Sequence, residues 1–131
     1  MKHVVTCFLK YNSQILILRR SHNVGSFRGK WAGVSGFIES TPDEQAFTEI
    51  AEETRLSRDD VELVKKGLPL DVEDDDRKWI VHPYLFNIKN KGKIETDWEH
   101  TEIHWIEPRE IDDYDTVPML KDALARVYKL V

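Results

Sequence analysis

The segment over residues 41–56, TPDEQAFTEIAEETRL, constrains the fold of this chain more than any other, because it carries a complete helix-start signal. Thr41 can cap the first turn, Pro42 suits the first helical position, and the Glu44 carboxylate can reach back to the cap amide. The sequence therefore predicts a helix that begins at Pro42. Spacing of three and four residues defines its expected buried face: Ala46, Phe47, Ile50, Ala51 and Thr54.

Three glutamates, Glu49, Glu52 and Glu53, fall on a different arc of the same helix. Like-charged side chains at this spacing repel one another by on the order of 0.2–0.5 kcal/mol per pair, and no lysine lies among them. A hard divalent cation such as Mg²⁺ would neutralise them, since it takes carboxylate oxygens as ligands. A solvated acidic face is the alternative, because exposed glutamate is common near a helix N-terminus. The helix alone leaves both interpretations open.

Length and composition exclude several classes of protein. The 131 residues suit one domain, 1–131, with a core of its own. The net charge of −5 argues against a nucleic acid duplex or an anionic membrane as partner, but permits a local basic cleft. Cys7 is the single cysteine, lies in an alternating segment and is expected to be a packed strand residue. No signal pattern and no apolar run of about 18 residues is present, so we expect a cytoplasmic location.

The remaining segments predict strands and a second helix. Apolar and β-branched runs predict a hairpin over residues 4–9 and 15–18, a strand over 31–39 broken by Gly33 and Gly36, and strands within 61–72, 79–88 and 102–106. Residues 71–78, DVEDDDRK, predict a solvated hairpin tip, with a second cation site as the alternative.

The C-terminal segment predicts an amphipathic helix. Its apolar positions lie at helical spacing, and Asp115 or Thr116 is the expected cap, with Pro118 in the first turn. The expected buried positions are Leu120, Leu124, Val127 and Val131.

The segment from Gly36 to Leu56 resembles the Nudix box, the signature of the Nudix hydrolases. That pattern is a glycine, five residues, a glutamate, seven residues, then Arg-Glu-apolar-x-Glu-Glu-x-Gly-apolar, and this chain keeps its second half from Glu49 to Leu56. A leading hairpin that ends in arginines, an acidic residue six places before Trp105 and a terminal helix extend the resemblance over essentially the whole chain. It implies an α/β fold, an α/β/α sandwich whose mixed sheet is flanked by the box helix and a C-terminal helix.

Several positions depart from the box. The span from Gly36 to Glu49 is two residues short, and Ser40 stands where the family has its first glutamate. Thr48 replaces the box arginine, which in the family pairs with the glutamate matching Glu49. Arg55 replaces a glycine at the expected helix end, where glycine is favoured because it accepts positive φ. Val34-Ser35-Gly36 replaces the usual Pro-Gly-Gly lead-in. These departures bear on activity more than on fold.

The resemblance also implies a reaction and its residues. Nudix hydrolases use Mg²⁺, with Mn²⁺ as a possible substitute, to cleave a nucleoside diphosphate linked to another moiety, such as a nucleotide sugar, a dinucleotide or a nucleoside triphosphate. Metals suit this chemistry because they neutralise phosphoryl charge and lower the pKa of an attacking water. The resemblance assigns these groups to the metal: Glu52, Glu53, Glu49 as a further ligand or water-orienting group, and the backbone carbonyl of Ser35. Glu99 matches a downstream glutamate that binds metal or acts as general base, with Glu102 as its rival.

Substrate contacts are less constrained. Arg20, Arg28 and Lys30 are the expected phosphate-binding residues, by charge and by position beside the glycine-broken strand. Tyr84 or Phe86 could stack on a base, although strand aromatics are more often core. The partner is then a small molecule, and a homodimer is possible. The alternative function, suggested by Thr48 and the shortened loop, is a catalytically weak or inactive Nudix-fold domain that binds a nucleotide or serves regulation. An isomerase is disfavoured because Cys7 lies in a predicted strand.

Overall fold

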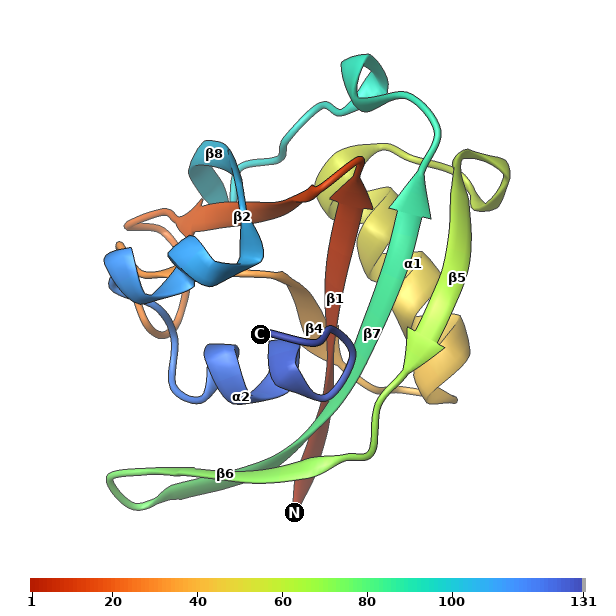
Figure 1. The fold of residues 1–131 in the computed structure, drawn as a ribbon. Coiled ribbons are helices and arrows are strands. Elements are labelled where there is room, and N and C mark those ends of the chain that lie inside the picture. Colours follow the sequence, from red (N-terminus) through yellow and green to blue (C-terminus); the bar gives the residue numbers. More distant parts are fainter. Residues whose placement is uncertain (131) are drawn as a thin grey trace.

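The computed structural model describes residues 1–130, which form a mixed sheet with helices on both faces (Figure 1). The eight strands of this part of the chain are β1 (Lys2–Tyr11), β2 (Gln14–Arg20), β3 (Trp31–Ala32), β4 (Val34–Phe37), β5 (Val61–Lys66), β6 (Leu70–Asp74), β7 (Arg77–Ile88) and β8 (His100–Ile106). The α-helices are α1 (Pro42–Thr54) and α2 (Leu120–Ala125), and short 3₁₀ turns are η1 (Arg58–Asp60), η2 (Lys91–Lys93) and η3 (Pro108–Asp113). The predicted α/β class is confirmed.

Strand β1 organises the sheet, whose main path is β3-β2-β1-β7-β5. It pairs in parallel with β7 and meets β2 only at Lys10 and Tyr11, which leaves its first half free to pair with β4. Gly33 marks the point where the chain changes partner, from β2 through β3 to β1 through β4. A Cβ there would lie 3.0 Å from the carbonyl oxygen of Cys7. The predicted break at Gly33 is therefore a switch of strand partner at a close backbone approach.

The alternation of β1 divides the core between the two faces of the sheet. Val5, Cys7 and Leu9 pack on the side of α1, whereas Phe8 packs with Leu124 on the side of α2. Successive strand side chains point to opposite faces, so one strand supplies both cores. The buried position predicted for Cys7 is confirmed.

Helix α1 begins at Pro42 as predicted, and Thr41 Oγ1 accepts a hydrogen bond from the Glu44 amide at 3.2 Å. The return bond expected from the Glu44 carboxylate is replaced by an exposed ion pair with Arg58 at 2.7 Å. The predicted buried face was wrong in part: Phe47 is only half-buried and Ala51 is exposed. The buried residues of α1 are Gln45, Ala46, Ile50, Glu53 and Thr54.

Arg55 ends α1 in the left-handed conformation, with φ of 66°. This is the conformation that a glycine adopts without steric cost and that costs other L-residues roughly 1–2 kcal/mol. We therefore expect Arg55→Gly to raise the free energy of unfolding by about 0.5–1 kcal/mol, after the added backbone entropy of glycine is subtracted. Urea unfolding followed by circular dichroism checks this, with Arg58→Gly in the neighbouring turn as a control that should not stabilise.

The C-terminal helix is shorter than predicted and begins later, at Leu120, after Met119 in the left-handed conformation. The expected caps are engaged elsewhere. The carbonyl of Asp115 accepts from the Trp31 amide at 2.9 Å, and Thr116 forms an isolated bridge with Trp31. Backbone paired with another strand cannot also enter a helix, which is why the helix starts late. The predicted position of Val131 lies outside the described residues.

Two other segments match their predictions. The run DVEDDDRK forms the β6–β7 hairpin, and the 61–72 segment divides into β5 and β6 around Gly67 and Pro69. No α-helix within residues 1–130 combines the length and the apolar character needed to cross a membrane. The cytoplasmic location and the homodimer stay predictions.

Candidate active site

A cavity of about 880 Å³ lies where α1, β4 and the loop before β8 meet. Its polar wall is formed by side chains from these three elements and from the end of β2: Arg20, Ser35, Gln45, Glu49 and Glu99. The remaining wall is largely apolar and aromatic. A concave site with a few convergent polar groups is the usual form of a small-molecule site.

Glu53 is only 2% exposed and lies behind this polar wall, beside the lining residue Glu99. Its Oε1 lies 3.5 Å from His100 Nε2, and its Oε2 has no hydrogen-bond partner among residues 1–130. Burial, reinforced by the nearby Glu49, raises the pKa of Glu53 from 4.5 to about 10. A buried carboxyl oxygen without a partner is costly. A bound cation would remove that cost.

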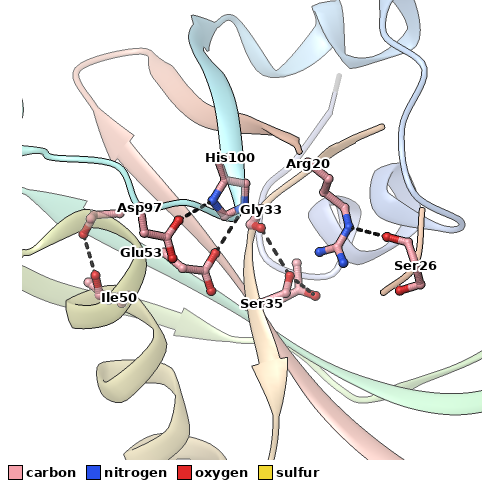
Figure 2. A network of polar contacts seen from close by, with 10 residues as sticks. Arg20, Ser26, Gly33, Ser35, Ile50, Glu53, Asp97 and His100 are labelled. Atoms are coloured by element: carbon pink, nitrogen blue, oxygen red, sulfur yellow. Dashed lines mark hydrogen bonds and ion pairs between the residues drawn. The ribbon is translucent and has the colours of Figure 1, made fainter. Parts of the chain in front are cut away.

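His100 contacts the Glu53 carboxyl through its ring. It was not among the site residues predicted from the sequence. Its Nδ1 lies 3.0 Å from Asp97 Oδ1, and Figure 2 shows the ring between the carboxyl groups of Asp97 and Glu53. Burial lowers the pKa of His100, which favours the neutral ring. With the proton on Nδ1 toward Asp97, Nε2 offers a lone pair to Glu53 or to a cation. No spacing signal marks this pair, because it depends on the turn that precedes β8.

The donor set fits a divalent cation. Glu53, Glu99 and His100 each present one ligand atom, and all three atoms lie within 4.8 Å of one another. Carboxylate oxygen suits Mg²⁺ and Mn²⁺, and imidazole nitrogen is tolerated by Mn²⁺ and later metals. The predicted arc of three glutamates divides, however. Glu53 is buried and Glu49 is half-buried, whereas Glu52 is exposed. The orientation of α1 about its axis turns Glu49 and Glu53 toward the sheet.

Glu49 is half-buried and held from two sides. Gln45 Nε2 donates to Glu49 Oε2 at 2.7 Å, and β4 passes so close that a Cβ on Gly36 would lie 2.1 Å from Glu49 Cδ. Burial raises the pKa of Glu49, while the Gln45 hydrogen bond opposes that shift. The break predicted at Gly36 was wrong: β4 continues through this residue, and the missing side chain makes room for Glu49 instead.

Glu99 and Glu102, the two rivals for the downstream role, lie in different surroundings. Glu99 lines the cavity, where burial and then Asp97 raise its pKa and Arg20 opposes that rise. Glu102 lies on β8 and forms an exposed ion pair with Arg19 at 2.9 Å. The fold therefore brings Glu99 to the carboxylate cluster and leaves Glu102 outside it.

Of the three basic residues expected at phosphate, the fold places only Arg20 at the cavity. Its Nε donates to the Ser26 carbonyl at 2.9 Å, so the terminal nitrogens are left to face a ligand (Figure 2). Burial lowers the pKa of Arg20, against the pull of Glu99 and Glu53. Arg28 donates to the Val24 carbonyl, and Lys30 pairs with Asp115 at 2.9 Å.

The cavity is also lined by three basic residues that no sequence pattern indicated: Lys2, Arg77 and Lys78. They come from the start of β1 and from the β6–β7 hairpin, and only the pairing of β1 with β7 brings them near the box helix. Ser35 also lines the cavity from β4, and its hydroxyl donates to the Gly33 carbonyl at 3.2 Å.

Comparisons with known proteins agree with this geometry. The sequence model of the NUDIX domain matches residues 1–130. A Caenorhabditis elegans Ap4A hydrolase in a binary complex superposes with a TM-score of 0.81 at 14% identity, covering 96% of this chain and 94% of that one. A MutT protein from Methanosarcina mazei Go1 gives 0.75 at 22%, covering 96% and 91%.

A third similar structure is the NUDIX domain of Shewanella oneidensis NrtR complexed with ADP ribose, with a TM-score of 0.70 at 12% identity, covering 95% of this chain and 84% of that one. Among proteins of curated function, no match was found. The predicted α/β/α sandwich is confirmed by these superpositions. The chain therefore belongs to the Nudix family, and its reaction class is that of a pyrophosphohydrolase.

Proposed function

We propose that this chain is a hydrolase dependent on Mg²⁺ or Mn²⁺ that cleaves the pyrophosphate linkage of a nucleoside diphosphate joined to another moiety. One observation carries the proposal: a buried Glu53 carboxyl with an unpartnered oxygen lies beside Glu99 and His100, and Glu99 lines a cavity that also presents Arg20. This arrangement combines a place for cations with a cationic side chain suited to phosphate.

The metal would be held by Glu53 and Glu99, with Glu49, the Ser35 carbonyl and Glu52 as further expected ligands. When bound, it supplies charge neutralisation and a lowered pKa for an attacking water. Glu49 and Glu99 both reach the cavity and are the groups that would orient that water or take its proton. Arg20 would bind the diphosphate oxygens, since its guanidinium is always charged and half-buried.

The test is a panel of dinucleotides, nucleotide sugars and nucleoside triphosphates with Mg²⁺, comparing wild type with Glu53→Gln. We expect turnover of at least one class, reduced by about a thousandfold in the variant, because metal polarisation supplies several kcal/mol. Turnover that is unchanged in Glu53→Gln would refute the role of Glu53. Calorimetric nucleotide binding with no hydrolysis across the panel would favour the binding or regulatory alternative.

A base-binding side chain is suggested by the cavity itself. Tyr84 and Phe86 are core residues, and the Tyr84 hydroxyl donates to Asp43, so neither can stack on a ligand. Trp98 lines the cavity beside Glu99 and is 65% exposed. A large exposed aromatic ring next to charged groups suits a planar base at one end of a diphosphate.

We therefore expect Trp98→Ala to raise KM for a nucleotide substrate by about tenfold with little change in kcat, because base stacking on an aromatic ring contributes roughly 1–3 kcal/mol. Trp98→Phe should retain most of the affinity. Steady-state kinetics with the panel's best substrate measures both. Equal KM in wild type and Trp98→Ala would exclude Trp98 from the base site.

A further inference from the structure

Gln45 lies one helical turn before Glu49 and is buried, at 8% exposure, although it is polar. Its Nε2 donates to Glu49 Oε2 at 2.7 Å, and its Oε1 accepts from the backbone amide of Glu39 at 3.1 Å. Only this orientation of the amide satisfies both neighbours, because a carboxylate needs a donor and a backbone N–H needs an acceptor. Gln45 is therefore fixed at both ends.

Among the described residues, no cationic side chain pairs with Glu49. None of the ion pairs within residues 1–130 involves Glu49. Thr48, at the position where the box has arginine, is exposed and uncharged. The backbone of β4 at Gly36 closes the other side of the carboxylate. The position of Glu49 thus depends on the neutral Gln45 amide, on the backbone of β4 and on the neighbouring Glu53 carboxyl, and on no cation.

Gln45 also joins the helix to the shortened connection that precedes it. Glu39 lies in that connection, two residues after the end of β4, and its amide donates to Gln45. One side chain therefore links the segment that leads out of the sheet with the carboxylate that faces the cavity. Glu39, Gln45 and Glu49 all line that cavity.

We propose that Gln45 is the positioning residue for Glu49, and that it replaces in this chain the orienting contact of the missing box arginine. The inference rests on the proposed function, in which Glu49 would bind the cation or orient the attacking water. A neutral donor fixes one oxygen while leaving the negative charge of Glu49 uncompensated, so that charge stays available to a cation.

The test measures Mn²⁺ affinity by calorimetry without substrate, and kcat and KM with the panel's best substrate. Gln45→Leu keeps the volume and removes the donor. We expect it to weaken Mn²⁺ binding and lower kcat by about 10–100-fold, as loss of an outer partner of a metal ligand does, with KM nearly unchanged and cooperative thermal unfolding retained. Adding Thr48→Arg to this variant should restore most of the loss, which a merely structural defect would not allow.

Two further variants make the test decisive. Gln45→Glu is isosteric and places a carboxylate against Glu49, so it should lose at least as much Mn²⁺ affinity even where Gln45→Leu fails to fold. Glu44→Gln, on the exposed side of the same turn and paired with Arg58, should leave both readouts unchanged. Unchanged Mn²⁺ affinity and kcat in folded Gln45 variants would overturn the inference alone. A wild-type protein that binds no Mn²⁺ would overturn the proposed function as well.

Discussion

Replacing Glu53 by glutamine is expected to stabilise the metal-free protein, by an amount that grows with pH. The pKa of Glu53 is about 10 in the fold against an ordinary value of 4.5, so the folded state binds this proton more tightly than the unfolded chain. The stability from that proton is complete below about pH 4.5 and is lost progressively as pH rises toward 10. Each unit in this window costs the wild type about 1.4 kcal/mol. Glutamine does not titrate and escapes the loss.

Urea unfolding at pH 6 and pH 8 with a chelator present measures this effect. The advantage of Glu53→Gln should increase by about 3 kcal/mol between the two values. Glu52→Gln is the matched control, because Glu52 lies on the same helix but is exposed. If the free energy of unfolding changed with pH in the same way in wild type and Glu53→Gln, the Glu53 carboxyl would be solvated or compensated. That result would also refute the cation site inferred from its unpartnered oxygen.

Gly36→Ala is expected to reduce kcat about 100-fold while leaving the fold largely intact. An added Cβ would lie 2.1 Å from Glu49 Cδ and 2.3 Å from Oε1, so the carboxylate must leave its position. The displaced atoms are the far end of a flexible side chain, which can move without disturbing the sheet. Misplacement of a site group by about 1 Å costs on the order of a hundredfold in rate.

Kinetics and thermal melting together check this expectation. Gly25→Ala is the control, since a Cβ there meets no atom within 4 Å, and it should change neither quantity. If Gly36→Ala kept full kcat, the position of Glu49 would not matter for the reaction. If it unfolded the protein, the contact with Glu49 would be part of the core.

Local chemistry explains which elements could be predicted from the sequence. The start of α1 follows from Thr41 and Pro42, whose capping effects act within a few residues. The break at Gly33 and the hairpin tip before Arg77 are also local signals. The late start of α2 was not predictable in this way, because the pairing of Thr116 with Trp31 joins segments far apart in the chain.

For the site, the sequence by itself determined which acids lie on one helix, since the Glu49–Glu53 spacing places them within two turns. Only the tertiary structure decided which of them enter the core. The rotation of a helix about its axis is set by packing, and polar Gln45 and Glu53 took buried positions that the hydrophobic pattern had assigned to Phe47 and Ala51. The residues that meet Glu53 come from another element, His100 at the start of β8 and Asp97 just before it, and their position depends on strand register, which no local pattern encodes.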